Sequence, residues 1–168
     1  RYCIVFSDRP LPLLYTSKNG DRRCLDCIVA YNEYGGYCLP VNSIHRPACQ
    51  RILSSAIQEP DTLQYIQSCL GKGGDVIHAG TYFGDFLPAL SKMGTKSSKV
   101  WAFEANPENY RCAYITAMIN DLKNVKITNA ALSNKNDRVF VKTENREGVG
   151  LGGQSHVTHE SDDDMCNG

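Results

Sequence analysis

The chain has 168 residues, of which 42% are apolar and 21% charged, the composition of one ordinary soluble domain. Lys and Arg number 18 and so do Asp and Glu, and this zero formal charge disfavours binding to nucleic acid through phosphate neutralisation. No apolar run reaches the roughly 18 residues of a membrane-spanning helix, and the N-terminal apolar stretch is too short for a signal peptide. We therefore expect a cytoplasmic protein with neither a nucleic-acid partner nor a membrane partner.

Eight cysteines are many for a chain of this length. Because the sequence has no signal peptide and no Asn-x-Ser/Thr sequon, we expect free thiols in a reducing compartment. Cys24 and Cys27, followed by Cys38 and Cys49, begin with the two-residue spacer of many zinc sites. A second such pair is missing, and Cys27 and Cys38 lie in apolar stretches where cysteine behaves as a small buried hydrophobe. We therefore expect no metal site.

The first part of the chain alternates short apolar runs with turn signals. Strands or hairpins are predicted over 2–6, 13–16, 25–31 and 37–41, with turns at 8–10, 18–21 and 35–36. A helix should follow, with Ser43 as its cap and Pro47 in its first turn, and a second helix should begin at Pro60 and end at 71–74. We expect residues 1–73 to form a small α+β N-terminal region.

From Asp75 the pattern changes to regular alternation of strands and helices. Strands are predicted over 76–79, 99–103 and 125–129, with a fourth candidate at 138–142, and helices over 86–93 and 107–120. Asn106 should cap the last helix and Pro107 should occupy its first position. This alternation indicates an α/β fold with a parallel sheet over residues 74–143.

Two features lie at the carboxyl ends of the predicted strands, where open α/β sheets bind ligands. Gly80 and Gly84 follow the first strand in a turn that leads into a helix. Glu104 follows the second strand, where a carboxylate can accept hydrogen bonds from both ribose hydroxyls. Together they indicate a nucleoside-containing cofactor, although two turn glycines and a solvated acid would give the same pattern.

Tyr82 distinguishes between cofactors. A dinucleotide site needs a second glycine at this position so that the backbone can approach the pyrophosphate. A tyrosine side chain would obstruct that approach, which disfavours a nicotinamide cofactor. S-adenosylmethionine, which has a ribose and an adenine but no phosphate, fits better.

These segments also carry a family resemblance. The stretches 75–85, 101–110 and 124–133, above all Phe-Glu-Ala-Asn-Pro-Glu-Asn-Tyr, resemble the FkbM family of S-adenosylmethionine-dependent methyltransferases. The resemblance implies a partial Rossmann-like methyltransferase core that transfers a methyl group to a hydroxyl of a small molecule or sugar. Gly80, Thr81 and Gly84 would border the methionine part of the cofactor, with Glu104 on the ribose. The cofactor-binding residues implied are His78, Ala79, Gly80, Thr81, Gly84, Asp85, Glu104, Ala105, Asn106, Ala130 and Ala131, with Ala105, Ala130 and Ala131 near the adenine.

The chain departs from the family in two respects. Most members have an acidic residue where this chain has His78. The family also continues with an Asp-x-Glu-Gly strand, whereas residues 144–168 are glycine-rich and acidic, and we expect them to form a flexible tail. We therefore expect the sequence to be a fragment of a longer enzyme. The alternative is a non-catalytic cofactor-binding or interaction module that completes its sheet edge in a homodimer.

No catalytic residue can be named from the sequence. His45 and His78 are the only histidines before the tail, and a lone histidine in an apolar strand is more often structural. A metal pair at His156 and His159 is disfavoured because both lie in the expected tail.

Overall fold

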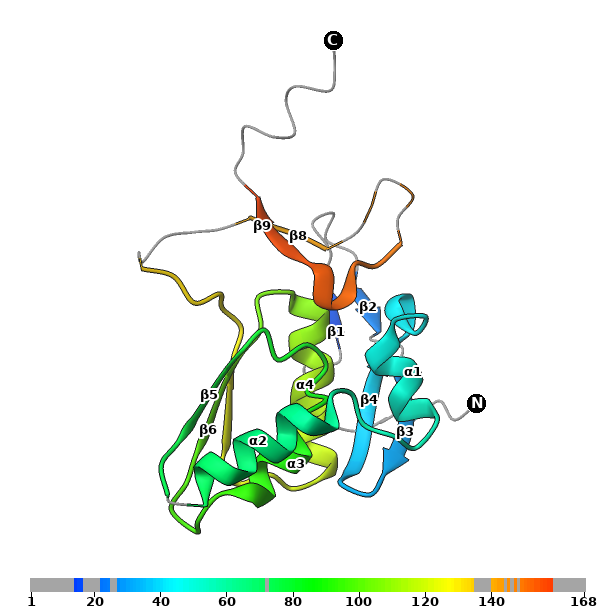
Figure 1. Cartoon of the computed structure of the whole chain (residues 1–168). Helices are drawn as coiled ribbons and strands as arrows, with labels where there is room; N and C mark the ends of the chain where they lie inside the picture. The colour runs from blue at the N-terminus through cyan, green and yellow to red at the C-terminus, as the bar shows by residue number, and fades with distance from the viewer. Residues whose placement is uncertain are drawn as a thin grey trace.

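A three-stranded parallel sheet forms the centre of the fold (Figure 1). The computed structural model describes residues 14–16, 22–24, 27–71, 73–134, 140–143, 145, 147 and 149–158. The strands are β5 (Val76–Ala79), β6 (Val100–Phe103) and β7 (Val125–Thr128), in the order β5-β6-β7. This mixed α/β arrangement confirms the predicted parallel sheet.

Three helices cover one face of this sheet (Figure 1). They are α2 (Pro60–Leu70), α3 (Leu87–Met93) and α4 (Pro107–Ile119). Helix α4 begins as predicted, because Asn106 Oδ1 accepts the backbone N–H groups of Glu108 and Asn109 at 2.9 and 3.4 Å. The buried core between sheet and helices comprises Leu63, Phe86, Leu87, Ala89, Leu90, Val100, Ala102 and Ala113.

The opposite face of the sheet carries no helix of the described chain (Figure 1). Ile77, in the centre of β5, is 69% exposed there, and Trp101 on β6 is only half-buried. The strand predicted over 76–79 is confirmed, but its residues are not buried on this side of the sheet. Parallel sheets are normally covered on both faces, and here the described residues leave one of the two faces open.

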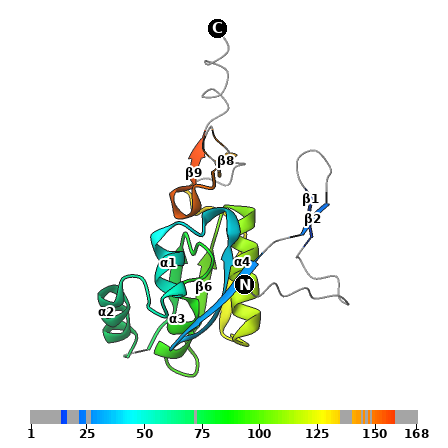
Figure 2. The same cartoon turned by 90° about the vertical axis from the view of Figure 1, so that its right-hand side faces the viewer.

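A β-hairpin forms a further layer on the other side of α4 (Figure 2). Its strands are β3 (Cys27–Asn32) and β4 (Gly35–Pro40), and the backbone N–H of Cys38 donates to Thr116 Oγ1 on α4 at 3.0 Å. The turn occupies Glu33 and Tyr34 and not, as predicted, the two glycines. Gly35 and Gly36 belong to β4, where a Cβ at Gly35 would lie 1.9 Å from Asn120 Oδ1, so the hairpin docks only without side chains there.

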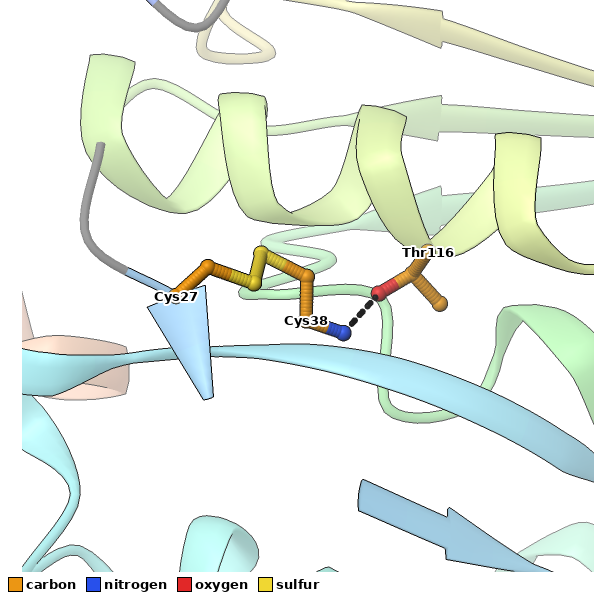
Figure 3. Close-up of a disulfide and its surroundings, with 3 residues drawn as sticks. All are labelled: Cys27, Cys38 and Thr116. Atoms are coloured by element: carbon orange, nitrogen blue, oxygen red, sulfur yellow. Dashed lines mark hydrogen bonds between the residues drawn. A yellow bond between two sulfur atoms is a disulfide. The ribbon is translucent and has the colours of Figure 1, made fainter. Parts of the chain in front are cut away.

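A disulfide joins the two strands of this hairpin (Figure 3). Cys27 and Cys38 are 11 residues apart, with Cα atoms separated by 5.5 Å. The expectation of free thiols is wrong for this pair, although Cys49, Cys69 and Cys112 are free. The pairing also removes Cys27 and Cys38 from the set considered for zinc. Alternation of apolar residues could not reveal it, because each cysteine lies in a segment that a buried thiol would suit equally well.

Helix α1 (Pro47–Leu53) begins later than Ser43. Residues Val41–Ser43 form the short helix η1, and the Ser43 side chain caps no helix. Its buried Oγ instead accepts a hydrogen bond from the Tyr82 hydroxyl at 3.0 Å. The predicted cap is therefore a contact between the N-terminal region and the loop after β5.

The C-terminal part of the described chain is ordered over a longer stretch than expected. Strand β8 (Phe140–Lys142) pairs antiparallel with β9 (His156–Thr158) and does not extend the central sheet. Between them lies the short helix η2 (Gly152–Gln154). The prediction of a flexible tail from residue 144 is therefore wrong for residues 152–158. The expected strand 2–6 and His159 lie outside the described residues, as does the acidic stretch 160–164.

The remaining described strands, β1 (Leu14–Thr16) and β2 (Arg22–Cys24), pair antiparallel with each other. Among the described ranges the longest helix is α4, with 13 residues, and none of the helices there combines the length and apolarity needed to cross a membrane.

Candidate functional site

The loop between β5 and α3 is a left-handed turn built on two glycines. Gly80, Tyr82 and Gly84 have φ values of 70°, 53° and 81°, a region that glycine adopts at little cost and tyrosine rarely. A Cβ at Gly84 would lie 2.9 Å from Leu87 Cδ1 and 3.3 Å from Ala113 Cα, so this glycine allows the loop to pack on α3 and α4. A Cβ at Gly80 would meet no atom within 4 Å, because the space above it is open.

Glu104 lies at the carboxyl end of β6, beside this loop, and is 7% exposed. One carboxylate oxygen accepts the backbone N–H of Tyr82 at 2.8 Å, and the other accepts that of Asn106 at 2.9 Å. Asn129 Nδ2 donates to the Glu104 carbonyl at 2.8 Å, which links the ends of β6 and β7. The carboxylate therefore links the loop after β5 to the start of α4, and the Glu104 carbonyl adds the link to the end of β7.

A cavity of about 220 Å³ opens at this edge of the sheet. It is lined by Ala79, Gly80, Glu104, Ala105, Ala130, Ala131, Leu132, Val141, Gly152 and Ser155. The structure thus brings together six of the residues singled out from the sequence, contributed by the ends of all three parallel strands. Small side chains line most of the wall, with one carboxylate at its edge.

A second cavity, of about 570 Å³, adjoins the first, and Gly80 lines both. His78 and Asp85 lie in this second cavity together with Arg46, Glu59 and Gln154. Arg46 and Glu59 belong to the N-terminal region, so this region supplies part of the wall of the second cavity.

Three of the expected residues line neither cavity. Thr81 is fully buried, and its Oγ1 lies 2.9 Å from His78 Nδ1, so it fixes the imidazole. Gly84 is a packing residue, as described above. Asn106 caps α4 and donates from Nδ2 to Ser155 Oγ at 3.1 Å. These residues support the shape of the site and do not face it.

The Tyr82 side chain is buried beneath the loop and lines the second cavity. Its hydroxyl lies against Ser43 and 3.6 Å from the Cys49 sulfur, beneath the loop. The steric argument against a dinucleotide is therefore wrong as stated. The loop still offers little to a pyrophosphate, because the Tyr82 N–H already donates to Glu104.

Burial sets the protonation of the titratable groups in the two cavities. Desolvation raises the pKa of Glu104, opposed by the N–H donors of Asn106 and Tyr82. Desolvation, with a smaller contribution from Glu59, raises the pKa of Asp85 to about 7, although the backbone N–H groups of Asp85 and Phe86 donate to its carboxyl. Burial lowers the pKa of His78, so the imidazole is neutral at pH 7, and its ring stacks on Phe86 at 5.7 Å.

Several lining residues carry no motif that sequence reasoning could use. Leu132, Val141, Gly152 and Ser155 reach the first cavity from segments that follow the last parallel strand. Arg46 and Glu59 reach the second from the N-terminal region. Only the packing of the hairpin, α1 and η2 around the β5 loop brings them there.

The chain was compared with known proteins at the level of sequence. It matches no protein-family model, and no curated protein matches it either. The geometry of the two cavities therefore carries the argument about function.

Proposed function

We propose that this chain is the cofactor-binding part of an S-adenosylmethionine-dependent methyltransferase with a partial Rossmann-like core. The acceptor would be a hydroxyl of a small molecule or sugar. The observation that carries the proposal is the first cavity, where the ends of three parallel strands place Gly80, Glu104 and the Ala130–Ala131 pair around one space. Ligands of open α/β sheets bind at this edge.

The residues present fit the nucleoside portion of the cofactor. The cavity volume of about 220 Å³ is below the roughly 300 to 1,000 Å³ of pockets that enclose a whole drug-sized ligand, so this cavity would hold only one portion of the cofactor. Adenine would lie against the methyl groups of Ala105, Ala130 and Ala131, and the Glu104 carboxylate at the edge of the cavity would accept the ribose hydroxyls. The rest of the cofactor would then continue past Gly80.

When bound, the sulfonium group supplies an activated methyl carbon that needs no metal or redox partner. The protein's own contribution is positional: Gly80 leaves room above the loop, and η2 covers the edge of the sheet through the bond from Asn109 Nδ2 to the Gly152 carbonyl at 3.3 Å. The acceptor would enter from the second cavity, where burial raises the pKa of Asp85 to about 7.

Calorimetric titration tests the nucleoside site. The chain should bind S-adenosylhomocysteine saturably and should not bind NAD. Adenosine should bind more tightly than 2′-deoxyadenosine by about 1 to 3 kcal/mol, the cost of a lost hydrogen bond to a charged group. This comparison needs no substitution, whereas Glu104→Ala also releases the Tyr82 and Asn106 N–H groups, so its folding must be checked by circular dichroism.

Equal binding of the two nucleosides would remove Glu104 from the ribose site, and a folded chain that binds neither would refute the proposal.

The second candidate is a non-catalytic module that retains half of the fold. Among the described residues, nothing pairs with the outer edge of β5 and no helix covers one face of the sheet. Both features favour the module, because they resemble surfaces that another chain covers. Such a module would bind the nucleoside and also self-associate through β5. Sedimentation equilibrium of the bound and free chain distinguishes it from a monomeric methyltransferase part.

A further inference from the structure

Helix α4 carries apolar side chains on three sides, and the described chain buries two of them. Ala113 belongs to the core between the helices and the sheet, and Cys112 and Ile115 belong to the core under the hairpin. On the third side Tyr114 is 39% exposed and Met118 is 49% exposed. A helix that is apolar on every side is usually covered on every side. The third side is therefore a candidate contact surface, and it is separate from the two cavities.

A groove beside this side of α4 extends the apolar surface. It has a volume of about 240 Å³ and lies between α4 and β7, with an apolar lining of Tyr114, Ala117, Met118, Leu122, Val125 and Ile127. The ring of Tyr110 lies 6.4 Å from that of Tyr114 and continues this surface toward the start of the helix. A strand added to β7 is disfavoured as the occupant, because β7 has only four residues and carries Lys126, two features that protect sheet edges from pairing. A second helix packed along α4 would fill the groove with side chains.

Four residues on this side are spaced as in the seam between two packed helices. Arg111, Tyr114, Met118 and Asp121 are three, four and three residues apart. A two-fold axis near position 116, perpendicular to the helix, exchanges the two ends of this series. Arg111 of one copy then meets Asp121 of the other, and Tyr114 meets Met118. Two antiparallel copies of α4 are therefore complementary in both charge and polarity.

The charged residues at the two ends are accessible for such a contact. The Asp121 side chain is 76% exposed, and its surface ion pair with Lys123 contributes little to stability, so the carboxylate can change partner. Arg111 Nη1 donates to the Pro107 carbonyl at 3.2 Å. Because a guanidinium has five N–H donors, this bond does not exclude a further acceptor.

We propose that two copies of this chain associate through antiparallel α4 helices, with Tyr114 and Met118 in the centre and an Arg111–Asp121 ion pair at each end. The contact is short, and small interfaces are typical of transient association, so we expect a weak dimer with a dissociation constant of about 100 µM. The proposal does not rest on the cofactor. It also uses neither the edge of β5 nor the open face of the sheet, which are the surfaces of the non-catalytic module.

Sedimentation equilibrium tests the surface. Wild-type chain should dimerise reversibly, and Met118→Glu, which places a carboxylate against Tyr114 of the second copy, should raise the dissociation constant at least tenfold. Tyr65→Glu is the matched control, because Tyr65 is 71% exposed on α2, which lies on the opposite side of the molecule from α4 (Figure 2). This variant should dimerise like wild type. Circular dichroism melting establishes that each variant is folded.

The two charges test the pairing itself. Arg111→Glu brings like charge to Asp121 of the second copy and should raise the dissociation constant at least tenfold. In the Asp121→Asn background, which keeps a residue suited to the left-handed φ of 52°, the same substitution should raise it less than threefold. Ten residues of helix separate the two positions within one chain by about 15 Å, so this coupling has to arise between copies.

Three outcomes would overturn the proposal. The first is a wild-type chain that stays monomeric at about 1 mM, well above the dissociation constant expected for a small interface. The second is an equal effect of Arg111→Glu in both backgrounds. The third is dimerisation that Met118→Glu leaves unchanged, which places the interface elsewhere, and its loss in Ile77→Thr would identify the open face of the sheet.

Discussion

Tyr82 connects more parts of the molecule than any motif around it indicates. Its hydroxyl contacts Ser43 and Cys49 from the N-terminal region, and its N–H binds Glu104 on the central sheet. A Cβ at Gly152 would lie 2.6 Å from the same hydroxyl, so η2 also packs against it. The sequence predicts that Tyr82 obstructs a phosphate, whereas in the structure it is a buried residue that contacts the N-terminal region, the central sheet and η2.

Asp85 should make stability depend on pH in a defined direction. Burial raises the pKa of Asp85 from its ordinary value of 3.8 to about 7 in the folded chain, so between these pH values the folded state binds one proton that the unfolded state lacks. The stability this gives is fully present below about pH 4 and is lost as the pH rises through about 7. In urea unfolding, wild type should therefore lose stability relative to Asp85→Asn between pH 4 and pH 7.

The difference between the two proteins isolates Asp85 from the other titratable groups, which both proteins share. A difference that does not change over this interval would show that the carboxyl is solvated in the folded state. Opposite slopes would contradict the desolvation argument.

At the scale of elements, the disulfide holds the hairpin that covers α4. Closing a loop of 11 residues stabilises the folded state by about 2 to 3 kcal/mol through lost chain entropy in the unfolded state. We expect Cys27→Ser/Cys38→Ser to lower the free energy of unfolding by about this amount. Cys69→Ser, at an exposed free thiol, should leave it unchanged.

Peptide mapping of the unreduced chain should recover Cys27 and Cys38 in one linked pair of peptides. Recovery of both as alkylated free thiols would contradict the pairing. Disulfides persist in oxidising compartments, so a confirmed link would also argue against the cytoplasmic expectation.

Local signals predicted most elements, and packing decided the rest. Helix α2 begins at Pro60 and α4 is capped by Asn106, as expected, because both signals act within one turn of the chain. Ser43 has the chemistry of a cap but is used by a tertiary contact, and Gly35 and Gly36 have the composition of a turn but lie in a strand against α4. Both predictions failed for the same reason: a side chain or a glycine can contact residues that are distant in the sequence as well as residues that are near.

At the scale of the whole molecule, the open face of the sheet has a measurable consequence. Ile77→Thr keeps the branched Cβ and removes exposed apolar atoms, so it should change the free energy of unfolding by less than about 0.5 kcal/mol. Leu90→Ala, at a site 1% exposed between the sheet and α3, should cost about 2 to 5 kcal/mol. Urea unfolding at two protein concentrations measures both.

A larger, concentration-dependent effect of Ile77→Thr would mean that a second copy covers this face in solution. That result would favour the module over the monomeric enzyme part.

The candidate site was predictable where strand ends determine it and unpredictable elsewhere. Gly80, Glu104 and the alanines that follow β6 and β7 could be predicted from the rule that parallel strands present their carboxyl ends together. Arg46 and Glu59 do not, because only the docking of the N-terminal region on the β5 loop brings them to the cavity. Sequence reasoning therefore found the residues of the first cavity more completely than those of the second.

The docking of the hairpin on α4 also determines when the protein can finish folding during synthesis. The Cys38 N–H and its acceptor on Thr116 are 78 residues apart. The ribosome must therefore synthesise most of the central region before the hairpin can pack on α4. Until then no helix covers Tyr37 and Leu39, which are fully buried in the folded protein. A cross-link between residues only 11 apart needs no distant partner, and it can keep the two strands paired until α4 emerges.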